Sequence, residues 1–165
     1  MIMKKLLLPA VLGLLLAACN PQTSSAPVFK GVDLTGADYA KDFQLPDTDG
    51  KIRSLQDFKG KAVVIFFGYT QCPDVCPTTM ADIAQAKKLL GPQGAKVQGV
   101  FITVDPERDT PQVLKAYMAN FDPAFVGLRG SPEQVAAVAK DFKVFYKKVE
   151  GKTPGNYTMD HSAAS

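Results

Sequence analysis

The apolar run at residues 61–67 (KAVVIFF) constrains the fold of this chain most strongly. After its first lysine it is continuously apolar and rich in β-branched and aromatic side chains. A strand of this composition is buried on both faces, as in the centre of a parallel sheet. The sequence therefore predicts a sheet that other elements cover on both sides.

Segments of helical and of strand type alternate after this run. Their apolar positions predict helices over 77–90, 111–121 and 132–142, and strands over 97–104, 125–128 and 144–149. Ahead of it, Asp49-Gly50 predicts the turn of a hairpin within 42–52, and residues 54–58 a short helical turn. This alternation predicts an α/β fold with parallel strands.

The first 19 residues indicate export. Two lysines precede an apolar stretch at 6–18, which is too short to cross about 30 Å of hydrocarbon as a helix. The ending Leu16-Ala17-Ala18-Cys19 resembles a bacterial lipobox, although an ordinary signal peptide with a chance cysteine is the alternative. We expect a signal peptide over 1–18, an acylated Cys19 with a flexible tether over 19–30, and one domain over 31–165. The domain would then be lipid-anchored to the cell membrane on its extracytoplasmic, periplasmic side.

The charge balance bears on the class of partner. The formal net charge is +3, and loss of Lys4 and Lys5 with the signal peptide takes it to about +1. Because no basic block survives, nucleic acid is not an expected partner.

Acylation of Cys19 would leave Cys72 and Cys76 as the thiols of the domain. They follow the run at 61–67, at the strand end where α/β sheets place their sites. A disulfide closing so short a loop stabilises little, so a structural staple is disfavoured. At the start of a helix we expect one thiol to ionise near neutral pH. Two sulfurs on one side of a helical turn favour copper(I) or zinc.

His161 is the single histidine of the sequence and a candidate third ligand. A lone histidine is more often an ordinary surface or core residue. Two sulfurs and an imidazole suit copper in a trigonal set, whereas a closed structural zinc site needs a fourth ligand. Met159 is one candidate for that place, but a core position is more typical of methionine.

Three separated blocks carry a family resemblance. Residues 66–79 (FFGYTQCPDVCPTT), 104–111 (VDPERDTP) and 160–162 (DHS) resemble the Sco/SenC family. The resemblance implies a thioredoxin-like fold and a membrane-tethered copper chaperone. Such a chaperone receives copper from a donor protein and delivers it to the dinuclear centre of cytochrome c oxidase subunit II. By the same resemblance, Cys72, Cys76 and His161 are the ligands of Cu(I) or Cu(II).

The resemblance also bears on the segment after the histidine. Members of the family typically continue with another hairpin and a closing helix. We therefore expect the closing C-terminal elements to be missing from this sequence.

A thiol–disulfide oxidoreductase acting on the cysteines of the same oxidase subunit is the alternative function. A vicinal pair of reactive thiols serves exchange as well as ligation. The three-residue spacer and the histidine argue against it. Thioredoxin-like active sites are flanked by a cis-proline, for which Pro154 is the only candidate, and Thr153-Pro154-Gly155 more simply predicts a turn. A metallochaperone is thus favoured over an enzyme.

Two further groups of residues have a predicted place. The charged block Asp105, Glu107, Arg108 and Asp109 could form a docking rim, but capping of the next helix by Asp109 or Thr110 is favoured. The core or near-core aromatic residues are predicted to be Phe66, Phe67, Tyr69 and Tyr117, with Tyr69 shielding the metal from water.

Overall fold

The computed structural model describes residues 30–153 and 155–162. Contacts divide the chain into two units, residues 1–36 and 37–165, and the described helices and strands belong to the second unit. In the first unit, the Asp33 carboxylate accepts hydrogen bonds from the backbone N–H and the hydroxyl of Thr35.

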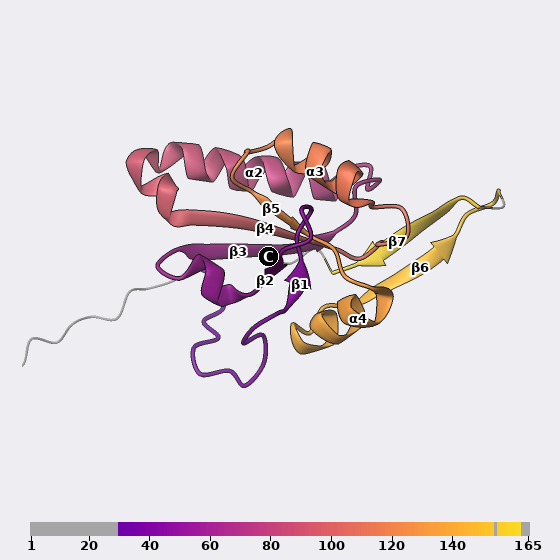
Figure 1. The fold of residues 1–165 in the computed structure, drawn as a ribbon, viewed down its shortest axis with the longest axis horizontal. Helices are drawn as coiled ribbons and strands as arrows, with labels where there is room; N and C mark the ends of the chain where they lie inside the picture. Colours follow the sequence, from indigo (N-terminus) through magenta and orange to yellow (C-terminus); the bar gives the residue numbers. More distant parts are fainter. Residues whose placement is uncertain (1–29, 154, 163–165) are drawn as a thin grey trace, which may run out of the picture. The chain divides into compact units, whose positions relative to one another are not determined.

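Three parallel strands form the central sheet, in the order β3-β4-β5. They are β3 (Ala62–Gly68), β4 (Val97–Thr103) and β5 (Val126–Leu128). Helices α2 (Val75–Leu89) and α3 (Pro111–Ala119) cover one side of the sheet, and α4 (Pro132–Asp141) covers the other (Figure 1). The predicted α/β fold with parallel strands is confirmed.

Consecutive side chains of β3 build the core on the two faces. Phe66 contacts Phe101 of β4, which in turn contacts Tyr117 of α3. Phe67 points the opposite way and packs against Phe142, at the end of α4. Phe66, Phe67 and Tyr69 are buried and Tyr117 is partly buried, as predicted. Burial increases along β3. Ala62 at its start is exposed, the next three residues are partly buried, and Phe66, Phe67 and Gly68 are buried.

Two antiparallel hairpins flank this sheet. The first, predicted from Asp49-Gly50, joins β1 (Leu45–Pro46) to β2 (Ile52–Arg53) and leads into the short helix η1 (Leu55–Phe58). Gly50 has φ +82°, which favours glycine. The second joins β6 (Tyr146–Glu150) to β7 (Tyr157–His161) as a separate two-stranded sheet. Strand β7 was not among the predicted elements.

The helix ends follow local sequence signals. Helix α2 starts at Val75, two positions before the prediction, which places Cys76 in its first turn. It gives way to η2 (Gly91–Lys96) at the predicted Gly-Pro stop. Thr110 caps α3, its hydroxyl accepting from the Val113 N–H. Ser131 and Gln134 form a capping box at α4.

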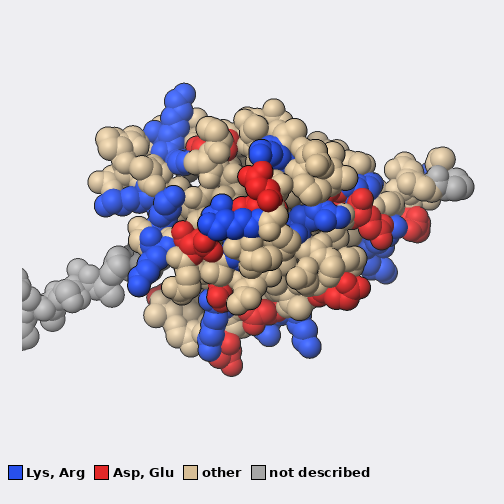
Figure 2. All heavy atoms as spheres, viewed as in Figure 1, with Lys and Arg blue, Asp and Glu red and all other residues tan. Residues whose placement is uncertain are grey.

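The surface carries charges of both signs. On the face shown in Figure 2, Lys and Arg side chains lie interspersed with Asp and Glu side chains. Within 30–153 and 155–162, none of the helices is long and apolar enough to cross a membrane.

Candidate metal centre

The loop over residues 69–74, called the cysteine loop here, and the first turn of α2 bring Cys72 and Cys76 to the carboxyl end of the sheet. The Cys72 N–H donates to the Tyr69 carbonyl over 3.2 Å, which closes a turn, and α2 then begins at Val75. The Cys76 N–H donates to Cys72 Sγ over 3.4 Å. The Cys72 sulfur thus accepts from a first-turn N–H that has no partner within the helix. This contact holds the two thiol-bearing residues side by side.

The third group comes from the other end of the domain. His161 is the last residue of β7, and its Nε2 lies 3.4 Å from Cys76 Sγ, although 85 positions separate the two residues. Its Nδ1 lies 3.0 Å from the Ser162 carbonyl oxygen, which can only accept a hydrogen bond. In the neutral imidazole this contact assigns the proton to Nδ1 and leaves the Nε2 lone pair facing the sulfur. This is the tautomer that a metal ion needs.

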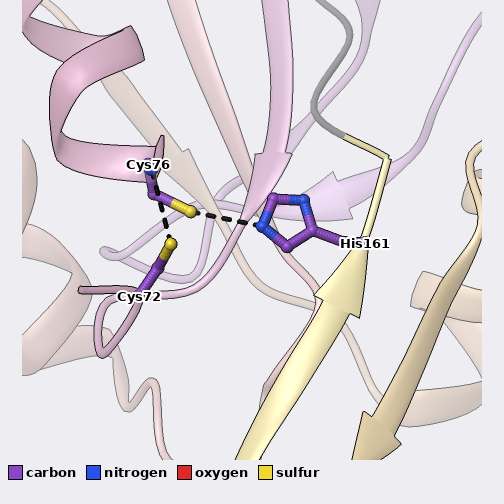
Figure 3. Close-up of side chains that lie close together, drawn as sticks. All are labelled: Cys72, Cys76 and His161. Carbon is purple, nitrogen blue, oxygen red and sulfur yellow. Dashed lines mark hydrogen bonds between the residues drawn. The ribbon is translucent and has the colours of Figure 1, made fainter. Parts of the chain in front are cut away.

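Cys72, Cys76 and His161 form one compact group of metal-binding side chains (Figure 3). Their ligand atoms all lie within 4.8 Å of one another. In a trigonal set, bonds of about 2.3 Å to sulfur and about 2.0 Å to nitrogen separate the donor atoms of one ion by roughly 3.7 to 4.0 Å. The Sγ–Nε2 distance of 3.4 Å and the 4.8 Å bound on the group both lie within about 1 Å of these separations, so small side-chain adjustments would let the three donors share one ion.

The two cysteines differ in exposure. Cys76 is completely buried, whereas Cys72 keeps an exposed fraction of 8%. Burial raises the pKa of the Cys76 thiol, and the neighbouring Cys72 side chain raises it further. Cys76 is therefore not the thiol of the pair that meets the expectation of ionisation near neutral pH, because the packing that places it in the first turn of α2 removes it from water.

Aromatic rings enclose the imidazole. The rings of Phe66 and Tyr69 meet the His161 ring edge-on, each with a centroid distance of 5.9 Å. Tyr69 is only 3% exposed, and burial raises the pKa of its hydroxyl. This position agrees with the predicted shielding role of Tyr69.

Glycine at the end of β3 leaves room for the Cys76 sulfur. A Cβ on Gly68 would lie 2.8 Å from Cys76 Sγ and 2.9 Å from a ring carbon of Phe66. Since carbon and sulfur cannot approach so closely, only glycine lets α2 lie this near the strand.

The charged block after β4 is mostly internal. Asp105 and Asp109 have exposed fractions of 3% and 0%. Asp109 accepts hydrogen bonds from the Thr70 N–H, the Thr70 hydroxyl and the Thr103 hydroxyl, and its burial raises its pKa. A docking rim made of all four charges is therefore wrong, because two of the carboxylates face inward.

Three expectations have particular outcomes here. Capping of α3 is confirmed for Thr110 and not for Asp109, which instead fixes the start of the cysteine loop. Met159 lies in the hydrophobic core, 8% exposed, as expected of a core methionine. Cys19 and Pro154 lie outside the described residues, so the structure does not test either expectation. Among the described residues, all peptide bonds are trans.

Sequence reasoning missed two features of the site. Tyr157 and Met159 are buried while Thr158 and Asp160 are exposed, an alternation that could have identified β7. The charged block predicts a surface position for Arg108, whereas its guanidinium donates hydrogen bonds to both the Gln71 side chain and the Tyr157 carbonyl. Sequence spacing carries no signal for that second contact.

Comparison with known proteins gives a consistent result. The family profile described as SCO1/SenC matches residues 32–165. A SCO2-like protein of Rickettsia felis is 43% identical over 123 residues, 74% of this chain and 60% of that protein. The chain thus spans about three fifths of the length of this curated relative.

Solved structures show the same relation. The structure of Bradyrhizobium japonicum ScoI with copper bound is 48% identical, with a TM-score of 0.68, over 74% of this chain and 77% of that one. BsSco, described with a disulfide switch and as a member of the Sco family of cytochrome c oxidase assembly proteins, is 31% identical, with a TM-score of 0.51, over 64% of each chain.

Proposed function

This chain belongs to the SCO1/SenC family, and we propose that it is a copper chaperone that binds one copper ion through Cys72, Cys76 and His161. The proposed acceptor is the dinuclear copper centre of cytochrome c oxidase subunit II. One observation carries the proposal: two thiols and an imidazole in the metal-binding tautomer converge within 4.8 Å. The copper-bound state of the similar ScoI structure supports the choice of metal.

The donor set favours copper chemically. Two soft sulfurs suit Cu(I), and the added imidazole nitrogen suits Cu(II) as well. A structural zinc site is usually closed by a fourth protein ligand, while the group of Cys, His, Asp and Glu side chains found among the described residues has three members. Three ligands leave one side of the ion open, which favours a metal that is passed on.

Release would begin from the cysteine loop. Cys72 is the thiol that retains some exposure, and its neighbours Gln71 and Pro73 are exposed. A ligand of the acceptor can approach the ion from this side and replace the Cys72 sulfur first, while Cys76 and His161 still hold it. We propose this order of ligand exchange for copper transfer.

The membrane anchor is part of the proposal. An acylated Cys19 followed by a tether over 19–30 would hold the domain at the extracytoplasmic, periplasmic face of the cell membrane. Replacement of Cys19 by serine is expected to move the protein from the detergent phase to the aqueous phase in a phase-partition assay. Unchanged partitioning would argue against the lipid.

Thiol–disulfide exchange is the second candidate function, with the cysteines of the same subunit as its substrate. Cys72 and Cys76 are free thiols held side by side, an arrangement that exchange also needs. The disulfide switch described for BsSco favours keeping this candidate. Exchange, however, has no evident need for a histidine whose tautomer is fixed at Nδ1.

Copper stoichiometry tests the proposal. We would measure it by anaerobic native mass spectrometry on the reduced full chain carrying Cys19→Ser, which removes the third thiol. One copper per chain is expected, lost when Cys72 and Cys76 are both serine and weakened by His161→Ala. The Cys19→Ser parent is the matched control for the loss of thiols. Absence of copper from this parent would move the assignment to thiol–disulfide exchange, which His161→Ala should leave near normal.

Redox state links the two candidates. Copper(I) needs both thiolates, so a Cys72–Cys76 disulfide should expel the ion. We expect a reductant to be required for loading, and retention of copper(I) by the fully oxidised protein would contradict the proposed ligand set.

A further inference from the structure

We propose that Arg108 is a positioning residue that fixes the histidine-bearing hairpin against the cysteine loop and so assembles the metal centre. The inference rests on the proposed copper site and names a residue outside its ligand set.

The attachment of the hairpin explains why a positioning residue is needed. Within residues 30–153 and 155–162, strands β6 and β7 pair with each other and share no hydrogen-bonded ladder with the β3-β4-β5 sheet. The position of His161 relative to the cysteines therefore depends on side-chain contacts rather than on strand register. A shift of about half an ångström of β7 relative to the cysteines would move the His161 imidazole out of the geometry needed to share one ion with both sulfurs.

Arg108 makes contacts in both directions. Its Nη1 donates to the Gln71 side chain, one residue before Cys72, over 3.1 Å. The same nitrogen donates to the Tyr157 carbonyl of β7 over 2.9 Å. One guanidinium thereby joins the cysteine loop to the strand that ends in His161.

Stacking adds to these hydrogen bonds. The Arg108 guanidinium carbon lies 3.6 Å from the centroid of the Tyr157 ring and 5.6 Å from that of Tyr69. Tyr69 also packs edge-on against His161. A planar cation between a ring of the hairpin and a ring of the loop orients both.

A buried carboxylate in turn orients Arg108. The Asp105 carboxylate is paired with Arg108 Nε and accepts from the Tyr157 hydroxyl over 2.9 Å. Arg108 Nη2 is buried and has no hydrogen-bond partner among the described residues. The guanidinium is therefore largely enclosed between the two segments that it contacts.

Lysine cannot reproduce these contacts, because an ammonium has neither the planar fork nor the stacking face. We therefore expect Arg108→Lys to loosen the hairpin while keeping the charge. Loss of an outer-shell partner typically lowers metal affinity by about 10- to 100-fold. Cu(II), which relies on the imidazole, should show this loss, whereas Cu(I), held by two thiolates, should change by less than about threefold.

The matched control is Arg53→Lys. Arg53 also pairs with a buried aspartate, Asp47, over 2.7 Å, but it lies in the β1–β2 hairpin. Both variants remove a guanidinium from a partly buried ion pair, so both should lower stability by similar amounts. Only Arg108→Lys should alter the metal centre.

Two readouts are taken on the full chain. The first is NMR of the metal-free protein, in which the single histidine gives one unambiguous imidazole signal that the adjacent aromatic rings shift. Arg108→Lys should move this signal toward the value of an unstructured peptide, and Arg53→Lys should not. The second is Cu(II) affinity, with electron paramagnetic resonance reporting the loss of nitrogen coupling.

The outcomes separate the two claims. Imidazole signals and Cu(II) affinities that match between the two variants would overturn the positioning role. A wild-type chain that binds no copper would refute the proposed function, and the metal-free NMR comparison would still decide the role of Arg108. Should Arg108→Lys fail to fold, Gln71→Ala removes the loop contact at an exposed position and should shift the same signal in the same direction.

Discussion

Gly68→Ala should damage the metal centre through a single methyl group. The added Cβ would lie 2.8 Å from Cys76 Sγ, 2.9 Å from a Phe66 ring carbon and 3.0 Å from a Phe101 ring carbon. Non-bonded carbon atoms prefer separations of about 3.5 to 4.0 Å, so the shortfall is roughly 0.7 Å. Phe66 and Phe101 are completely buried and cannot move aside. The Cys76 sulfur, or the start of α2 that carries it, must therefore shift.

This shift is large for a metal ligand. Metal–ligand distances are held within about 0.2 Å, so a sulfur displaced by roughly 0.7 Å no longer shares an ion with His161 without rearrangement. We expect copper affinity to fall about tenfold or more. Overpacking of this kind also costs about 1–3 kcal/mol of folding free energy.

Gly127→Ala provides the matched control. Gly127 lies on β5, away from the three ligands, and an added Cβ there would lie 2.7 Å from the Leu114 side chain of α3. Both variants should lose similar stability in urea denaturation, but a competition titration with a copper chelator should show weaker binding for Gly68→Ala alone. Equal copper affinity for the two variants would show that the Cys76 sulfur does not rest on Gly68.

Three further predictions concern stability. Because the folded pKa of Cys76 lies above its ordinary value of 9.0, the stability present below about pH 9 is lost as pH rises beyond it. Urea denaturation of the metal-free protein should show a larger fall between about pH 7.5 and about pH 10 for wild type than for Cys76→Ala, and parallel curves would contradict this. Thr110→Ala should cost about 1 kcal/mol, with Thr110→Ser near wild type, because the hydroxyl caps α3; equal losses would exclude the cap. Asp109→Ala should cost about 2–4 kcal/mol in thermal unfolding, since the Thr70 N–H loses its buried acceptor; a loss below about 1 kcal/mol would contradict that role.

Most of the fold follows from local patterns in the sequence. The run at 61–67 and the helical period after it predict β3 and α2 to within two residues. Asp49-Gly50 places the first hairpin, and Thr110 and Ser131 place the starts of α3 and α4. These features depend on neighbours within a few positions, so they can be recognised without the tertiary structure.

The weaker predictions concern residues whose environment is distant in sequence. The charged neighbours of Asp105 and Asp109 predict a surface position. In the structure, however, the Asp109 carboxylate accepts a hydrogen bond from the Thr70 N–H, and the Asp105 carboxylate accepts one from the Tyr157 hydroxyl. A cysteine at the start of a helix is expected to have a low pKa. The close packing of Cys76 against Gly68, which buries the thiol and raises its pKa, is visible only in the folded structure. Burial is a property of the whole domain and has no short-range signature at these positions.

Local patterns of residue type are enough to predict the α/β order of elements, and the family resemblance identifies Cys72, Cys76 and His161 as candidate ligands. Only the folded chain shows that these side chains meet, because 85 positions separate Cys76 from His161 and no spacing rule spans that interval. Folding also brings the Ser162 carbonyl against His161 Nδ1 and places Arg108 in contact with both the hairpin and the cysteine loop. The physical reason is that chemical identity is carried by each residue, whereas distance, desolvation and proton position arise from packing between segments that the chain brings together only on folding.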